Sequence, residues 1–150
     1  MALWSCGDAL APADLTGSYD LARVNGTPPP GSVAAAEPSC AIGFEQGRVD
    51  IFTLDSRSWF VLQSWRRLTC PGFGGSGSEY DPLGLGGVFT LRGRTLLITV
   101  ADTPADTLRL EATAFGDGLR VVLPEGFFGL AAPATLFFGP RRDLPLRSAP

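Results

Sequence analysis

Histidine and lysine are both missing from this sequence, whose 12 basic residues are all arginines. Without histidine, Ser-His and Cys-His catalysis are excluded, and the commonest ligand of zinc and iron sites is gone. The arginines are scattered except at Arg66-Arg67 and Arg141-Arg142, so no basic footprint for nucleic acid exists. We therefore predict a protein that is not an enzyme and that has no cofactor, no metal and no nucleic-acid partner. Any catalysis would rest on carboxylates alone.

Long apolar runs and helical periodicity are missing as well. With no run of about 18 apolar residues, no segment is predicted to cross a membrane as a helix. The sequence instead combines 45% hydrophobic residues with 19 glycines and 13 prolines, which is typical of many short strands separated by turns. At 150 residues the chain suits one domain, which we place at residues 15–142. A flexible tail or lipoprotein tether (1–14) precedes this domain, and a disordered tail (143–150) follows it.

Residues 87–123 have the pattern of two consecutive β-hairpins. Four segments rich in β-branched and aromatic residues follow one another: GVFTL, TLLITV, TLRLEATA and GLRVV. Glycine-containing turns lie at 92–94 and 116–118, where a hairpin needs backbone that accepts a positive φ. In the third segment leucine and alanine alternate with charged and polar residues, so one face of the sheet is buried and the other meets water.

The rest of the chain is predicted to add strands to this sheet. Further strands are expected at residues 15–25, 40–54, 59–69 and 134–138. A turn at Gln46-Gly47 divides the second of these. The connections comprise a proline-rich crossing loop (28–39), a flexible glycine linker (72–78) and a loop over the barrel end (124–133). A sheet of this kind covers its own apolar face by curling, so the fold class is predicted to be all-β, an antiparallel up-and-down barrel of eight or nine strands.

Several short motifs resemble the small lipocalin-like barrel lipoproteins of bacteria. They are Gly17-Ser18-Tyr19-Asp20-Leu21, Val24-Asn25-Gly26, Gly87-Val88-Phe89-Thr90-Leu91, Thr95-Leu96-Leu97-Ile98-Thr99 and Leu136-Phe137-Phe138 with Arg141. The resemblance covers Leu15 to Arg142 and implies an eight-stranded barrel that is exported and often lipid-anchored. In lipocalins the first strand carries Gly-x-Trp, whose ring closes one barrel end beneath an arginine of the last strand. Here Tyr19 stands in place of the tryptophan, a departure from the pattern, and Arg141 or Arg142 is the candidate partner.

The three cysteines suggest one disulfide and one odd residue. Cys40 and Cys70 lie at predicted strand ends, where a three-strand meander could bring them to the same rim of the barrel, and we predict that they form a disulfide. The alternative is two buried free thiols in a cytosolic protein. Cys6 follows Leu3-Trp4-Ser5, which has the shape of a lipobox, although only five residues precede it. It is either a lipidation site in a shortened leader or an ordinary tail cysteine.

These features predict a location in the bacterial periplasm or at the outer membrane, as a lipoprotein. Contact with a membrane would be made only through the lipid anchor. A disulfide would agree with that location, because disulfides persist in oxidising compartments.

The strand at 59–69 is the most aromatic segment, and both of its faces are largely apolar. Trp59, Val61, Gln63 and Trp65 share one face, and Phe60, Leu62, Ser64 and Arg66 share the other. Large rings are the side chains best suited to cover an apolar ligand. The candidate ligand-binding residues are therefore Tyr19, Trp59, Gln63, Trp65 and Phe89.

Two functions remain open at this stage, with a third less favoured. The leading prediction is a non-enzymatic envelope barrel that binds a small hydrophobic molecule in its interior or mouth. The alternative is a protein-interaction or accessory subunit of an envelope assembly, which would use the two-sided apolar strand and an exposed Phe127-Phe128 pair. The third is a barrel enzyme that uses carboxylates, or simply shape and desolvation, to guide a substrate. The inward positions decide whether an interior cavity exists, and they are predicted to be Phe89, Leu96, Ile98, Leu110, Val121 and Phe137.

Overall fold

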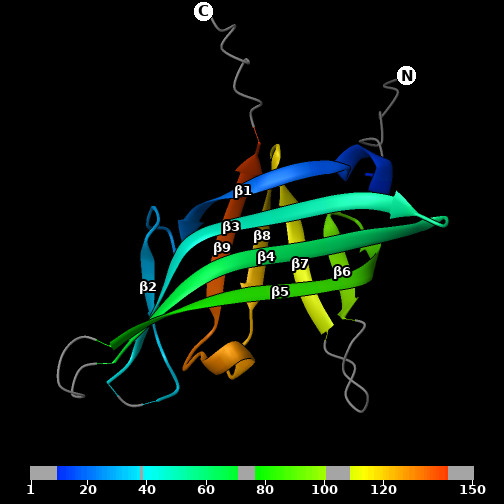
Figure 1. Cartoon of the computed structure of the whole chain (residues 1–150). Coiled ribbons are helices and arrows are strands. Elements are labelled where there is room, and N and C mark those ends of the chain that lie inside the picture. The colour runs from blue at the N-terminus through cyan, green and yellow to red at the C-terminus, as the bar shows by residue number, and fades with distance from the viewer. Residues whose placement is uncertain (1–9, 38, 71–76, 101–108, 142–150) are drawn as a thin grey trace, which may run out of the picture.

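A computed structural model describes residues 10–37, 39–70, 77–100 and 109–141 (Figure 1). Nine strands form one antiparallel sheet in the order β1-β9-β8-β7-β6-β5-β4-β3-β2. The strands are β1 (Gly17–Val24), β2 (Gly31–Ala34), β3 (Ala41–Leu54), β4 (Arg57–Cys70), β5 (Gly77–Arg92), β6 (Thr95–Val100), β7 (Arg109–Phe115), β8 (Gly118–Leu123) and β9 (Ala134–Pro140). Two 3-10 turns accompany them, η1 (Pro12–Leu15) and η2 (Phe127–Gly129).

The sheet closes because β1 pairs with β3 as well as with β9. Eight strands thus form a closed barrel and β2 is an extra strand, which confirms the predicted fold class. No helix in the described part of the chain is long and apolar enough to span a membrane. The predicted tails, with Cys6, lie outside the described residues, apart from residues 10–14, which lead into and form part of η1. Arg142, the last residue of the predicted domain, lies outside them as well.

The predicted crossing loop at 28–39 is wrong in part, because β2 lies within it. Gly31–Ala34 pairs with Ala41–Phe44 at the start of β3. The prolines at 28–30 cannot donate to a ladder, but the four residues after them carry N–H groups and complete a short edge strand. Strand β3 therefore has two neighbours on one side, β2 along its first residues and β1 along its later ones.

The predicted turn at Gln46-Gly47 is also wrong, because β3 runs without reversal through these residues. Phe44 pairs with Arg66 and Gln46 pairs with Trp65, which leaves Glu45 as an extra residue in a β-bulge. Such a bulge shifts the alternation of side chains by one position without reversing the chain. Burial follows this shift, since even-numbered residues point inward before the bulge and odd-numbered ones after it.

Strand β5 begins ten residues earlier than the sequence pattern predicted, at Gly77 rather than Gly87. Its first part includes the last two residues of the predicted linker and pairs with β4 out to the Cys70 and Gly77 pair. Residues 71–76 of that linker lie outside the described residues. Backbone pairing with β4 makes residues 77–86 part of a strand, although their glycine-rich sequence lacks the alternation of apolar and polar residues that is typical of one. Pairing with β6 begins only at Gly87.

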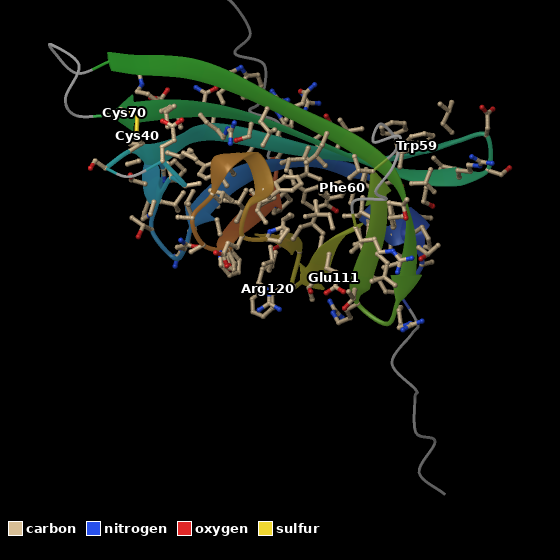
Figure 2. All side chains as sticks on the ribbon, turned by 90° about the horizontal axis from the view of Figure 1, so that it is seen from below. Cys40, Trp59, Phe60, Cys70, Glu111 and Arg120 are labelled. Atoms are coloured by element: carbon tan, nitrogen blue, oxygen red, sulfur yellow. A yellow bond between two sulfur atoms is a disulfide. The ribbon has the colours of Figure 1, made fainter. Side chains whose placement is uncertain are left out.

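The described interior of the barrel is filled by side chains that form one continuous cluster. Figure 2 shows Phe60 among them, whereas Glu111 and Arg120 point away from the barrel. An eight-stranded barrel is just wide enough for such filling. The predicted inward positions are confirmed for Phe89, Leu96, Ile98, Leu110 and Val121.

Phe137 is the exception among the predicted inward positions. It is half-buried on the outer face, because its neighbours Leu136 and Phe138 point inward, with 0% and 2% of their surface exposed. The last strand therefore has the opposite alternation to the one predicted.

Replacement of Phe60 by alanine should test how tightly this interior is packed. Phe60 is fully buried, so Phe60→Ala is expected to lower the free energy of unfolding by about 3–5 kcal/mol in urea titrations. Val61→Ala, on the outer face of the same strand, is the control and should cost about 1 kcal/mol or less. Equal losses for the two variants would contradict the assigned faces of β4.

Candidate functional site

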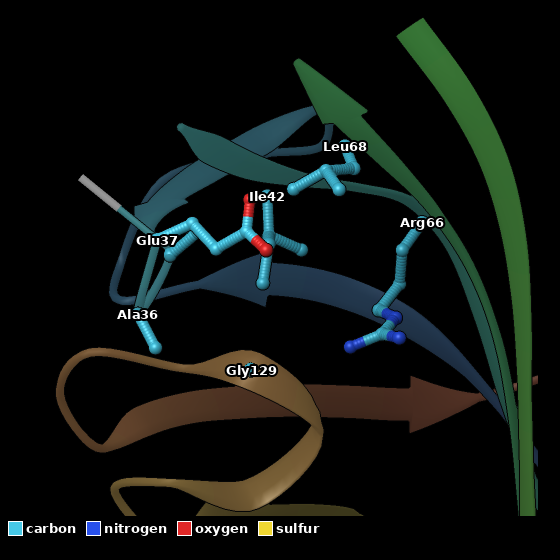
Figure 3. Close-up of a pocket in the computed structure, with 7 residues that line it drawn as sticks. Ala36, Glu37, Ile42, Arg66, Leu68 and Gly129 are labelled. Atoms are coloured by element: carbon cyan, nitrogen blue, oxygen red, sulfur yellow. The ribbon is translucent and has the colours of Figure 1, made fainter. Parts of the chain in front are cut away.

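A pocket lies at one mouth of the barrel, between the turn after β2, the end of β4 and η2. We call it the mouth pocket, and its lining residues are Ala35, Ala36, Glu37, Ile42, Arg66, Leu68 and Gly129. Its volume is about 150 Å³ (Figure 3). A cavity of that size accommodates a group such as benzene, so it fits the end of a ligand rather than a whole lipid.

Backbone hydrogen bonds hold the two walls of the mouth pocket together. The N–H of Ala36 donates to the carbonyl of Gly129 (2.6 Å), and the N–H of Ala131 donates to the carbonyl of Ala34 (3.0 Å). Ala35 and Leu130 form an isolated bridge between these bonds. The chain around η2 thus folds against the barrel end, as predicted for residues 124–133.

The predicted exposure of Phe127 is wrong. Phe127 has only 7% of its surface exposed and belongs to the core cluster, because η2 turns its ring under the barrel end. The side chain of its neighbour Phe128 lies outside what the structure describes. Phe127 is therefore not available for the interaction surface that these two rings were expected to form.

Arg66 supplies the positive charge of the mouth pocket. Its side chain points inward because it continues the inward row of β4, and only 6% of its surface is exposed. Figure 3 shows the guanidinium group in the space that Ile42 and Glu37 border. A buried guanidinium beside aliphatic walls suits a carboxylate or phosphate group, because a charge-assisted hydrogen bond is stronger than a neutral one.

The disulfide between Cys40 and Cys70 is confirmed and adjoins this pocket. Its sulfur atoms are 2.05 Å apart and its Cα atoms 4.2 Å apart. A single long hairpin, rather than a three-strand meander, brings the cysteines together, because the neighbouring residues Ala41 and Thr69 are paired. Disulfides are typical of oxidising, extracytoplasmic compartments.

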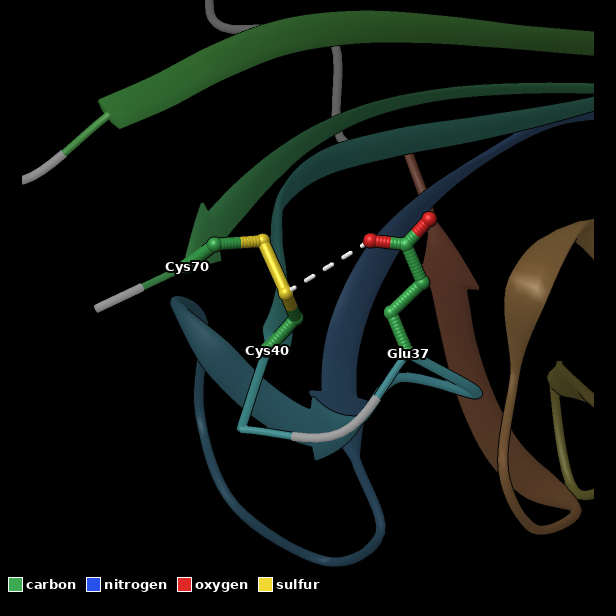
Figure 4. The surroundings of a disulfide bond; sticks show 3 residues. All are labelled: Glu37, Cys40 and Cys70. Carbon is green, nitrogen blue, oxygen red and sulfur yellow. Dashed lines mark hydrogen bonds between the residues drawn. A yellow bond between two sulfur atoms is a disulfide. The ribbon is translucent and has the colours of Figure 1, made fainter. Parts of the chain in front are cut away.

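Glu37 links the disulfide to the mouth pocket (Figure 4). One of its carboxylate oxygens lies 3.9 Å from the Sγ of Cys40. Because a disulfide sulfur carries no proton, this approach is a contact rather than a conventional hydrogen bond. The bridge therefore fastens the turn that carries Glu37 to the end of β4.

The structure divides the predicted ligand-binding residues between two faces. Tyr19 and Phe89 are buried, with 8% and 3% of their surface exposed. Trp59, Gln63 and Trp65 instead lie on the outer face of β4, where the two tryptophans are half-buried and Gln63 is exposed. The five residues therefore do not meet in one cavity. Arg66, which lines the pocket, belongs to the other face of this strand, from which the sequence pattern selected no ligand-binding residue.

Tyr19 helps to close the opposite end of the barrel. Its hydroxyl donates to the carbonyl of Leu15 (2.7 Å), and burial, assisted by the negative charge of Asp117, raises its pKa. Arg141, the candidate partner of Tyr19, lines the same groove as Tyr19. Its Nε lies 4.0 Å from a carboxylate oxygen of Asp20. The tyrosine is thus fixed by η1, in which Leu15 lies.

Comparison with protein-family models, with curated proteins and with solved structures found no match, so the argument about function rests on the fold and its pockets.

Tyr19→Phe should lower stability and change its dependence on pH. Loss of the hydrogen bond to Leu15 is expected to cost about 1 kcal/mol at pH 8. Because the pKa of Tyr19 is raised above 10.0 on folding, its contribution is complete below pH 10 and is lost as the pH rises through the folded-state pKa. The difference between wild type and variant should therefore shrink above pH 10 in urea titrations. A constant difference would contradict the raised pKa.

Removal of the disulfide should destabilise the barrel. The bridge spans a sequence separation of 30 residues. The chain-entropy relation then gives a loss of about 3.6 kcal/mol for the double variant Cys40→Ser, Cys70→Ser. Peptide mapping without reductant should recover the two cysteines in one linked fragment, and free alkylation of both in denatured, unreduced protein would contradict the bridge.

Proposed function

We propose that this protein is a non-enzymatic binding barrel of the bacterial envelope that holds the acidic end of a small apolar molecule in its mouth pocket. The observation that carries the proposal is the guanidinium of Arg66, buried beside the aliphatic side chains of Ile42 and Leu68. Apolar walls bind a hydrocarbon segment, and the guanidinium binds the acid.

The packed interior favours the mouth over the centre of the barrel as the binding place. Phe44, Phe60 and Leu62 are completely buried within the core cluster. A ligand in the centre would have to displace such side chains, which well-packed cores resist. At the mouth only the end of a ligand enters, and the rest extends toward solvent past the exposed residues Ala36 and Gly129.

The carboxylate of Glu37 does not prevent an acid from binding in the mouth pocket, but it favours ligands with one acidic group over ligands with two. It is exposed, so water screens its charge, whereas the charge of Arg66 acts in a poorly solvated position. A ligand with one acidic group can reach Arg66 and keep its remaining length away from Glu37. We therefore expect a monoacid, such as a fatty acid, to bind better than a diacid.

A lipocalin-like, exported lipoprotein is the setting that we propose for this activity. The closed eight-stranded barrel and the disulfide support an exported binding protein. The lipobox-like residues Leu3 to Cys6 support a lipid anchor, and they lie outside the described residues. Mass spectrometry of the natural protein for diacylglycerol on Cys6 tests the anchor.

The second candidate function is that of an accessory subunit which binds an envelope protein. With Phe127 buried, its support is Phe115, which is 72% exposed at the turn between β7 and β8. Phe115 borders an outer groove with Phe137 and Ala22. If no small molecule binds, and if Phe115→Ser abolishes the copurification of a protein from envelope extract, the accessory-subunit function is favoured over ligand binding.

Titration of the intact protein with decanoic acid and 1-decanol should test the mouth pocket. A charge-assisted hydrogen bond contributes about 1.5–3 kcal/mol. Arg66→Gln should therefore lower the affinity for decanoic acid roughly tenfold to a hundredfold and leave the affinity for 1-decanol nearly unchanged. Arg67→Gln is the matched control, because Arg67 lies on the outer face of the same strand and pairs there with Glu45 (2.7 Å). Calorimetry gives both affinities.

A second variant keeps the test decisive if Arg66→Gln does not fold. Ala36→Leu adds an apolar side chain at an exposed lining position and fills the pocket without burying a polar group. It should lower the affinity for both decanoic acid and 1-decanol. Folded wild-type protein that binds neither probe, or an Ala36→Leu variant that binds both as wild type does, would overturn the proposed function.

A further inference from the structure

A second groove lies on the outside of the barrel, over the seam where β1 joins β3. We call it the seam groove, and its polar and aromatic lining consists of Asp20, Glu45, Gln46, Arg48, Trp65 and Arg141. Its volume is about 360 Å³. That volume falls in the range of about 300–1,000 Å³ that small-molecule sites occupy. The mouth pocket shares no lining residue with it.

Two strand irregularities build the seam groove (Figure 1 shows β1 beside β3). On β3 the bulge at Glu45 lets two consecutive residues, Glu45 and Gln46, line the outer surface. On β1 the register with β9 shifts between Leu21 and Arg23, and Leu21 also lines the groove. Bulges re-aim side chains and occur often beside functional sites. In a regular strand only one of Glu45 and Gln46 would point outward.

An ion pair and hydrogen bonds hold the side chain of Arg48 in place beside the groove. Arg48 donates from Nε to Asp50 (2.9 Å) and from a terminal nitrogen to the Ser18 hydroxyl (3.2 Å). Ser18 in turn donates to Asp50. A guanidinium has five N–H donors, and these bonds use two of them. Partly buried surface pairs of this kind add little stability, but they position the groups that form them.

The charges that line the seam groove balance. Two arginines, Arg48 and Arg141, and two carboxylates, Asp20 and Glu45, line it. The partners just outside the lining preserve the balance, because Arg48 pairs with Asp50 and Glu45 pairs with Arg67. An anion or a cation would therefore gain little net attraction. An apolar molecule would make no hydrogen bonds with the polar groups of the lining. The half-buried indole of Trp65, which pairs across strands with Gln46, provides the one large flat surface.

We propose that the seam groove binds a neutral saccharide. A sugar ring carries hydroxyl groups that both donate and accept hydrogen bonds, and one of its faces is made of C–H groups. The carboxylates accept from hydroxyls, the arginines and Gln46 donate to them, and the C–H face packs on the indole of Trp65. The site is distinct from the mouth pocket and does not depend on the function proposed for it.

A neighbouring groove indicates a chain of sugars rather than one ring. It shares Arg48 and Arg141 with the seam groove, crosses β1, and adds Thr16, Tyr19 and Asp117 to the lining. This extension brings one more carboxylate and no further basic residue, so it gives no reason to expect an anionic chain. A neutral oligosaccharide could lie along both grooves.

Calorimetric titration of the full chain with glucose, maltotriose and tri-N-acetylchitotriose tests the proposal, with inorganic phosphate as the anionic probe. At least one trisaccharide should bind saturably and more tightly than glucose, and phosphate should not compete with it. Trp65→Leu keeps an apolar side chain but removes the ring, and it should lower the affinity for the trisaccharide about tenfold.

Trp59→Leu is the matched control, because Trp59 is half-buried on the same outer face of β4 but does not line the groove. It should bind the trisaccharide as wild type does. Asp20→Asn, at an exposed position, should also weaken binding and is the second variant if Trp65→Leu does not fold. Folded wild-type protein that binds neither trisaccharide, equal weakening by Trp65→Leu and Trp59→Leu, or displacement of the sugar by phosphate would each overturn the proposal.

Discussion

The long antiparallel pairing of β3 with β4 is the constraint on which the rest of this structure depends. It runs from the Leu54 and Arg57 pair at the turn to the Ala41 and Thr69 pair at the open end. The turn residues Asp55 and Ser56 have φ values of 51° and 62°, which fits a two-residue hairpin connection whose twist matches that of the strands. The disulfide fixes the other end. A hairpin held at both ends determines which side chains face the barrel and which face water.

The bulge at Glu45 reconciles this register with the apolar pattern of β3. Ile42 and Phe44 are buried on one side of it, and Val49 and Ile51 on the other, although the two pairs differ in parity. Without an extra residue, one of the pairs would face solvent, because strand side chains alternate strictly. The same residue creates the polar corner of the seam groove. One irregularity thus serves both the core and the outer surface.

The sequence predicts the parts of this fold where burial and exposure contrast sharply. In β7, Leu110, Ala112 and Ala114 alternate with polar residues, so their inward direction followed from the pattern alone. The disulfide followed from two cysteines at strand ends. The faces of β4 could not be chosen in this way, because Phe60 and Leu62 on one face are as apolar as Trp59 and Val61 on the other. Only the closed sheet decides between them.

Other features depend on partners that a local pattern does not contain. Gly31–Ala34 and the first part of β5 are strands because β3 and β4 offer unpaired backbone groups, not because of their side chains. For the mouth pocket, the pattern placed Arg66 on the same face as Phe60 but did not show that this face is inward, and the chain around Gly129 that meets it comes from a distant part of the sequence. A pocket between such segments becomes visible only when the barrel closes.

The two candidate sites are joined through consecutive residues of β4. Trp65 faces the seam groove and Arg66 faces the mouth pocket. A slip of one residue between β3 and β4 would exchange them, placing an indole in the mouth and a guanidinium on the outer face. The Asp55-Ser56 turn at one end and the disulfide at the other oppose that slip. The disulfide therefore has a role beyond stability, since it preserves the register that gives each site its chemistry.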